Sequence, residues 1–202
     1  MSGIPNTQPA SPPQKSDVRV LRSRDALGDA LIELMQEQSF ESITVQQVLD
    51  RAGVSRSTFY SHYRDKEDLL LSDVEDFFEL LGSLLTRHNA PPTRIFPVEE
   101  FFSHLGEMRD LNAAINASGK GPDVRELGIG HFARSIEQRL VLSGVNLSVI
   151  EIRATSHSLA GALFSLLDWW LHQNHPISPK EADALFHRMA WSGLPNPGPV
   201  AP

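Results

Sequence analysis

The segment TVQQVLDRAGVSRSTFYSHYRDKEDLL, from Thr44 to Leu70, combines many hydrogen-bonding side chains with closely spaced aromatic rings. An exposed loop rarely carries so many aromatic residues, and a buried helix rarely carries so many polar ones, because an unpaired polar group is costly to bury. One side of this segment must therefore pack against the rest of the protein. The other side must face water or a polar partner.

Two short helices joined by a tight turn are predicted in this segment. Thr44 is an expected N-cap, and the valines and leucine that follow it form one apolar face. Gly53 is expected to end this helix in the left-handed conformation, and Ser55 is the expected cap of the next helix. Two short helices around a glycine-containing turn are typical of a helix-turn-helix.

The second short helix has an inward and an outward face. Phe59 and Tyr63 lie four residues apart, so we expect both to turn inward against the neighbouring helices. On the outward face, arginine can hold guanine through two hydrogen bonds, serine and threonine can bond to several bases, and the residues further along suit phosphate contacts. The candidate DNA contacts are Arg56, Ser57, Thr58, Tyr60, His62 and Lys66.

Alternatives remain open for these polar residues. The three residues at the front of the helix could form an ordinary solvated face, and Tyr60 could be half-buried with its hydroxyl in water. Upstream, Arg19, Arg22 and Arg24 either reach DNA from an N-terminal arm or form a solvated charge cluster.

The remainder of the chain is predicted to be helical throughout, which gives an all-α fold. Apolar residues recur at helical spacing before the segment, and Asp65 is the expected cap of a long helix after it. Ser178, Pro179 and Glu181 form a strong helix start. The other expected helices are Val18 to Gln38, Val98 to Met108, Leu111 to Ala117, Pro122 to Leu142, Leu147 to His172 and Pro179 to Trp191.

Composition limits the classes of function. The 202 residues are 41% hydrophobic, contain no cysteine and carry a net charge of −7. Such a chain is expected to fold as a globular protein without disulfides, and any DNA site must be local because phosphate affinity comes from Lys and Arg. No membrane span is expected, residues 1–16 and 195–202 are predicted to be flexible tails, and a cytoplasmic location is expected.

The quoted segment resembles the DNA-binding signature of TetR-family transcriptional regulators, in the order T-V, A-G-V-S, T-F-Y, H-Y and K-E-x-L. The resemblance covers residues 24–70 and adds Thr44, Gln46 and Ser55 to the expected DNA-binding residues. Gln46 stands where the family often has a basic residue, and Ser57 stands where it often has glycine. These departures are expected to change operator preference rather than the fold.

The resemblance implies a helix-turn-helix domain over 17–65, followed by a helical ligand-binding and dimerisation domain over 66–194. The helix before His172 is apolar on several sides, so a second subunit is expected to cover one of them. A wholly intramolecular core is the alternative. The residues expected at the dimer interface are Leu159, Leu163, Leu167, Trp170 and Leu185.

The family resemblance also implies a small-molecule effector bound among the C-terminal helices. Pockets of this kind are mostly apolar with a few polar groups. The residues expected to line it are Phe78, Phe101, Phe102, His104, Leu105, Met108, Phe132, Ile136, His157, Phe164, Asp168 and Trp169. Because this set contains no Lys or Arg, a mainly apolar or aromatic effector is expected rather than a strongly anionic one.

No catalytic residue, metal site or cofactor is predicted. The sequence contains no phosphate-binding glycine loop, nucleophile elbow or HExxH pattern. His172 and His175 lie three residues apart, but they lack carboxylates at ligand spacing and are more typical of a helix surface. The expected function is a homodimeric repressor released from a palindromic operator by an effector. The alternative is a helical metabolite-binding protein or enzyme with an incidental helix-turn-helix.

Overall fold

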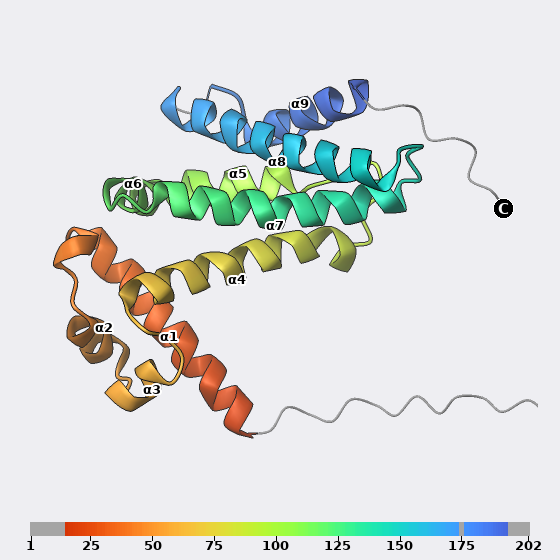
Figure 1. Cartoon of the computed structure of the whole chain (residues 1–202). Helices are drawn as coiled ribbons and strands as arrows, with labels where there is room; N and C mark the ends of the chain where they lie inside the picture. Colours follow the sequence, from red (N-terminus) through yellow and green to blue (C-terminus); the bar gives the residue numbers. More distant parts are fainter. Residues whose placement is uncertain (1–14, 174–175, 194–202) are drawn as a thin grey trace, which may run out of the picture.

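The computed structural model describes residues 15–173 and 176–193, and every regular element in these ranges is helical (Figure 1). The helices are α1 (Lys15–Glu37), α2 (Val45–Ala52), α3 (Arg56–Tyr60), α4 (Lys66–Arg87), α5 (Val98–Glu107), α6 (Arg109–Ala117), α7 (Gly121–Leu142), α8 (Val149–His172) and α9 (Pro179–Ser192), with a 3-10 turn η1 (Phe40–Ser42). The predicted all-α fold is confirmed. Most of both predicted tails lies outside the described residues, although α1 begins at Lys15, inside the first of them.

The expected caps explain why the helices begin where they do. Asp65 accepts a hydrogen bond from the Asp68 backbone N–H at 2.8 Å, which starts α4. Ser178 and Glu181 form a complete capping box at the start of α9. The helix expected from Leu147 begins two residues later, because Ser148 caps it with Glu151 as its capping-box partner.

Two hydrophobic cores are arranged along the chain. The first joins α1, η1, α2, α3 and the first turn of α4, where Leu69 and Leu70 are buried. The second joins the rest of α4 to α5, α7, α8 and α9. Figure 1 shows α4 lying along the bundle of later helices while α1 crosses it and carries α2 and α3. Because α4 contributes to both cores, a movement of α4 changes the packing of both.

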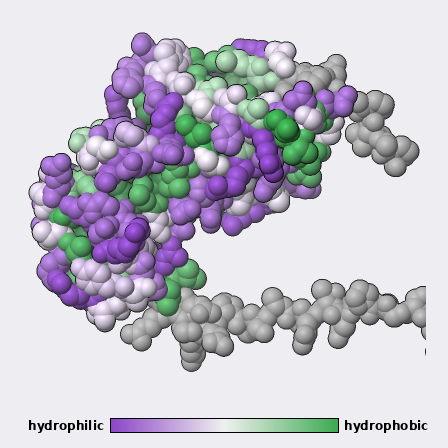
Figure 2. Space-filling view, viewed as in Figure 1, coloured by the Kyte–Doolittle hydropathy of each residue, from purple (hydrophilic) through white to green (hydrophobic). Residues whose placement is uncertain are grey.

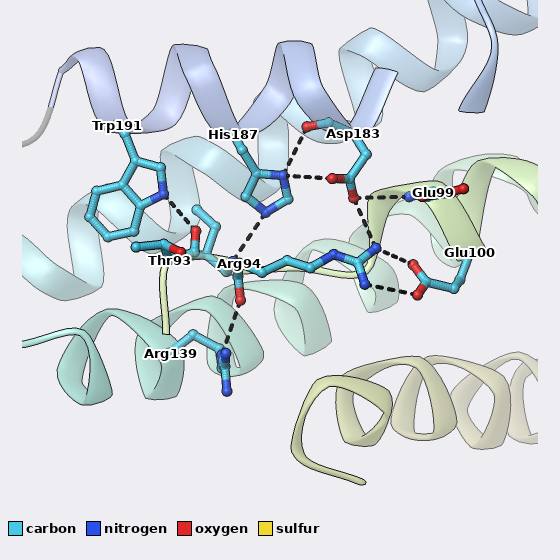
Figure 3. A network of polar contacts seen from close by, with 9 residues as sticks. Thr93, Arg94, Glu99, Glu100, Arg139, Asp183, His187 and Trp191 are labelled. Carbon is cyan, nitrogen blue, oxygen red and sulfur yellow. Dashed lines mark hydrogen bonds and ion pairs between the residues drawn. The ribbon is translucent and has the colours of Figure 1, made fainter. Parts of the chain in front are cut away.

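The connection between α4 and α5 is fixed by a polar network (Figure 3). From α7, Arg139 donates hydrogen bonds to the backbone oxygens of Ala90, Pro91 and Arg94. From α9, Trp191 donates to the oxygen of Thr93 at 2.7 Å, and the Nε2 atom of His187 accepts the N–H of Ile95 at 3.1 Å. The backbone of this connection is thus bonded to two helices.

Arg94 carries the charged part of the same network. Its guanidinium contacts Glu100 and Asp183, the latter at 3.1 Å. Burial works against the charge of Asp183, but hydrogen bonds from His187 and Arg94 lower its pKa to about 2. This carboxylate therefore remains ionised and ties α9 to the segment before α5.

Candidate functional site

The helix-turn-helix is formed by α2, the turn at Gly53 and α3. Thr44 and Gln47 form a reciprocal capping box at the start of α2, with the Gln47 N–H bonded to the Thr44 hydroxyl at 3.2 Å. Gly53 has φ of 65°, a left-handed conformation that costs a residue with a side chain more than it costs glycine. The predicted caps at Thr44, Gly53 and Ser55 are confirmed.

The outward side of this unit joins α2 and α3 through side chains. Arg56 donates to the Gln46 side-chain oxygen at 3.1 Å, and its guanidinium lies 6.0 Å from the ring centre of Tyr60. The Gln46 amide in turn donates to Asp50 at 2.8 Å. Arg56, Gln46 and Tyr60 are all exposed. The structure therefore brings these three candidate DNA contacts together on one surface.

The hydroxyl groups at the start of α3 bond mainly to one another. Ser55 accepts the Thr58 N–H at 3.2 Å and lies 2.8 Å from the Thr58 hydroxyl and 3.0 Å from the Ser57 hydroxyl. Ser55 and Thr44 thus act as helix caps. Among the candidate serines and threonine of α3, Ser57 is exposed without serving as a cap, while Thr58 is half-buried.

The inward side of α3 matches the prediction. Phe59 is fully buried and Tyr63 nearly so, and their rings lie 5.7 Å apart. Arg24 of α1 donates to the Tyr63 hydroxyl at 3.1 Å, to Ser72 at 3.2 Å and to Asp76 at 2.8 Å. The sequence leaves two alternatives for the upstream arginines, a DNA contact and a solvated charge cluster. Arg24 fits neither, because its side chain joins α1 to α4. The Arg19 side chain lies outside the described residues.

Lys66 has contacts that differ from the expected phosphate contact. Its ammonium group donates to the backbone oxygens of Phe40, Glu41 and Ile43 at 2.6, 3.1 and 2.7 Å and lies 4.7 Å from the Phe40 ring centre. An ammonium group has three donors, so these bonds engage all of them. Lys66 therefore anchors the start of α4 to the η1 turn.

His62 is half-buried beside Tyr63, with ring centres 6.2 Å apart. It lies at a surface groove between α7 and the segment after α3, together with Glu75 and His131. Arg64 is more exposed, with 86% of its side chain accessible, and pairs with Asp68 at 3.1 Å. The prediction did not include Arg64, although its place directly before the α4 cap is visible in the sequence.

A cavity of about 560 Å³ lies among α4, α5, α6, α7 and α8 and reaches α1 at Ile32. Most of its lining is apolar or aromatic, as expected of a pocket for a small molecule. Seven of the residues predicted to line the effector pocket do line it, namely Phe78, Phe101, His104, Leu105, Met108, Phe164 and Asp168.

The other residues predicted to line the pocket lie elsewhere. Phe102, Phe132 and Ile136 are fully buried in the second core, where Phe102 packs on Trp170 with ring centres 5.1 Å apart. His157 and Trp169 lie on the exposed side of α8. Helical spacing alone does not distinguish a residue that borders a cavity from one that fills the core beside it.

The cavity also contains a cation that sequence reasoning missed. Arg125 of α7 borders it, contacts Asp168 of α8 at 2.5 Å and lies 5.5 Å from the ring centre of Phe164. The predicted set of lining residues contained no Lys or Arg, whereas the lining of this cavity includes Arg125. Because Asp168 already pairs with this charge, an anionic guest would have to compete with a carboxylate for it.

Two titratable groups of the cavity, Asp73 and His104, have shifted pKa values. Burial raises the pKa of Asp73 on α4 to about 7, and Asp76 adds to the effect. Burial lowers the pKa of His104, whose ring stacks on Phe77 with centres 4.3 Å apart. Neither Asp73 nor Phe77 was among the predicted pocket residues, although both lie on the apolar side of the α4 pattern that contains Phe78 and Leu81.

Three of the five predicted dimer contacts are buried within the chain. Leu163, Leu167 and Trp170 lie in the second core, and the Trp170 indole donates to the Ile177 oxygen at 2.7 Å. Leu159 and Leu185 are partly buried. The first three side chains pack within the chain, where α8 lies against α7 and shares the second core with α5 and α9.

No helix in the described part of the chain is long and apolar enough to cross a membrane. The same residues contain no group of three or more His, Asp or Glu side chains placed to hold a metal ion.

Comparisons with known proteins match both the sequence and the fold. Residues 27–72 match the model of the family described as bacterial regulatory proteins, tetR family. The chain is 37% identical over 167 residues to the HTH-type transcriptional regulator YxbF of Bacillus subtilis, a match that takes in 75% of this chain. The chain spans 40% of the length of that relative.

Solved structures share the fold over nearly their whole length. A TetR transcriptional regulator from Streptococcus agalactiae is 27% identical and superposes with a TM-score of 0.61, covering 87% of this chain and 97% of its own. The dihydroxyacetone kinase operon activator DhaS is 15% identical with a TM-score of 0.64, covering 84% and 94% of the two chains. The second likeness concerns the fold alone.

Proposed function

Because residues 27–72 match the tetR family model and the fold resembles that of a solved TetR regulator, we propose that this chain is a TetR-family regulator that binds a palindromic operator as a homodimer and represses transcription until a small molecule enters its cavity. The observation that carries this proposal is the exposed surface of Arg56, Gln46 and Tyr60 at the front of α3. The matched relatives are regulators, so an enzyme with an incidental helix-turn-helix is not retained.

In this proposal the side chains of the helix-turn-helix have different tasks. Arg56 and Ser57 read base edges, while Gln46, Tyr60 and His62 contact the backbone or adjacent bases. Thr44, Ser55 and Thr58 hold the helix starts in place. Lys66 acts indirectly, by fixing the angle between α4 and the η1 turn.

The DNA-binding proposal is tested with the region flanking the protein's own gene, by fluorescence anisotropy at several salt concentrations. Arg56→Ala should weaken binding to the preferred site by about 1–3 kcal/mol and relax preference at one position. Arg153→Ala is the matched control, because Arg153 is exposed on α8 and lies outside the helix-turn-helix. Equal binding of wild type and Arg56→Ala to every sequence would contradict this role.

The dimer surface is proposed on the outer side of α8, not on its buried leucines. Its small exposed residues allow close approach of a second helix, and Trp169 is 43% exposed at one end of the row. The row consists of Ala154, Ser158, Ala162, Ser165 and Trp169. We include Leu185 and the 59%-exposed Met189 of α9 in the proposed surface.

A two-fold dimer is needed because recognition helices must reach half-sites separated by about one turn of DNA, roughly 34 Å. Ala162→Arg should give monomers in light scattering and abolish operator binding. Ala113→Arg, on exposed α6, should leave the dimer intact. A wild-type protein that is monomeric at the concentrations used for DNA binding would overturn the dimer.

The effector proposal rests on the cavity that reaches from the second core to α1. A molecule that fits one arrangement of these helices better than another shifts the population between them, and α4 would carry the change to the DNA-binding unit. Apolar and aromatic compounds should therefore raise the melting temperature and weaken operator binding together. Phe77→Ala should abolish both effects while operator binding without a compound is kept.

A further inference from the structure

The ionisable residues of the cavity lining are unevenly paired. The charged residues among the described cavity lining are Asp73, Arg125 and Asp168. Arg125 and Asp168 are 2.5 Å apart and neutralise each other. Burial lowers the pKa of His104 and so disfavours its charged form. The remaining acid of the lining is Asp73, whose carboxyl is partly ionised at pH 7.

The Asp73 carboxyl is largely buried, and the nearby positive charge of Arg24 offsets the cost of this burial only in part. It lies directly against the α1 backbone, since a Cβ atom added at Gly28 would be 2.2 Å from its Oδ2 atom. A largely buried carboxylate is costly, so it gains more from a new cationic partner than a solvated one would.

Aromatic residues line the same cavity as this carboxyl. Phe77 lies one helical turn after Asp73 on α4, and both border the cavity. The ring of His104 stacks on Phe77, and Phe101 lies 6.4 Å from it. A cavity that combines a carboxylate with aromatic side chains favours an organic cation, because both attract positive charge.

We propose that the effector of this cavity is an organic cation: a mainly apolar or aromatic molecule with one protonated amine, which lies against Asp73 and Phe77. This inference rests on the proposed function, in which the cavity holds the effector. Arg125 is not available to an anionic group unless Asp168 releases it. The same cavity therefore disfavours carboxylates and phosphates.

The position of Asp73 also links the guest to DNA binding. Asp73 touches Gly28 of α1, and α1 supports α2 and α3. An amine that draws the carboxylate toward the cavity changes the contact between α1 and α4. Arg24 ties the same two helices one turn away, through Tyr63, Ser72 and Asp76.

Three probes of nearly equal shape but different charge test which class of guest the cavity prefers. They are 1-naphthylmethylamine, 1-naphthylmethanol and 1-naphthoate, measured by calorimetry on the full chain. The wild type should bind the amine about tenfold more tightly than the alcohol, and the naphthoate most weakly. Asp73→Asn should bind amine and alcohol equally. Asp29→Asn removes the same charge from the exposed side of α1 and should keep the preference.

The pH dependence of amine binding tests whether Asp73 is the group that contacts the amine. Groups that interact with Asp73 are Arg24, Asp25, Asp29 and Asp76, and those facing it across the cavity are His104, Arg125 and Asp168. Because the pKa of Asp73 is about 7, a cation that requires its ionised form should bind about fivefold more tightly at pH 7 than at pH 6. Asp73→Asn should lose this dependence.

Each contrary result has a distinct meaning. Equal binding of amine and alcohol by the wild type, tighter binding of naphthoate, or stronger amine binding as the pH falls would overturn the organic-cation inference and leave a cavity for another guest. Failure of all three probes to bind would overturn the inference together with the effector role of the cavity. Operator binding by the wild type without probes tests the regulator proposal independently of either result.

Discussion

The two hydrophobic cores of this protein differ in how far apart their members lie along the chain. The N-terminal core is built from residues between Leu27 and Leu70, whereas the C-terminal core joins residues from Phe78 to Ala190. In the first core, the starts of α2, α3 and α4 are each fixed by a side chain three residues from its partner. In the second, neighbours on α5 and α9 are separated by most of the domain. Local spacing therefore explains the first core much better than the second.

The outer surfaces of the two regions differ as well. Exposed polar groups on α2 and α3 are joined to one another, as Arg56 is to Gln46. The C-terminal region instead exposes apolar residues where α7 passes to α8, including Leu142 at 65% and Ile150 at 81%. Figure 2 shows hydrophobic side chains gathered toward that end of the bundle. Hydrogen bonds within the chain thus position the polar side chains on α2 and α3. Apolar side chains form no hydrogen bonds and are not positioned in this way.

The largest effect is expected in the C-terminal core. Phe132 is fully buried, and its ring lies 4.3 to 5.2 Å from those of Phe78, Phe96, Phe101 and Phe164. Phe132→Ala should lower the free energy of unfolding by about 3–5 kcal/mol, measured by urea denaturation. The exposed Leu142→Ala should change it by less than about 0.5 kcal/mol. Similar losses in both variants would contradict the placement of Phe132.

The junction between the two cores should respond to pH through Asp73. Its folded pKa of about 7 lies above the ordinary value of 3.8, so the folded state binds the proton more tightly. Stability from this group is complete below about pH 4 and is lost as the pH rises through 7. Asp73→Asn should therefore stabilise the protein by roughly 2 kcal/mol at pH 8, after allowance for partial solvent screening, and by much less at pH 5. An equal gain in stability at pH 5 and pH 8 would mean that Asp73 is not the group that titrates.

Lys66 distinguishes a structural role in the N-terminal core from a DNA contact. Lys66→Met removes three hydrogen bonds to backbone oxygens and should lower the free energy of unfolding by about 1–3 kcal/mol. If the lysine anchors α4 as its contacts indicate, the salt dependence of operator binding should stay unchanged. A salt slope lowered by about one unit would restore the phosphate contact predicted from the sequence.

The smallest effect is expected at an exposed ion pair of the DNA-binding unit. Arg64 and Asp68 lie four residues apart, and most of the Arg64 side chain is in water. Arg64→Ala should lower stability by only about 0.3–0.5 kcal/mol, because solvent screens such pairs. A clear loss of operator affinity with this small stability change would add Arg64 to the DNA-binding surface.

The sequence by itself determined the elements and several of their ends. Thr44, Gly53, Ser55, Asp65 and Ser178 each occupy the capping position that was predicted, because a cap depends on backbone groups only a few residues away. It also determined that Phe59 and Tyr63 face inward, since their spacing on a short helix leaves few alternatives. The family signature lies in this same local segment.

Only the tertiary structure decided which face of a C-terminal helix meets which neighbour. Phe102, Phe132 and Ile136 fill the core, while Phe101 and Phe164 also border the cavity, yet all five follow helical spacing. Arg125 and Asp168 are 43 residues apart, and Lys66 bonds to Phe40 across 26 residues. Such contacts depend on how whole helices cross, and periodicity within one helix specifies an apolar stripe but not the partner that will cover it.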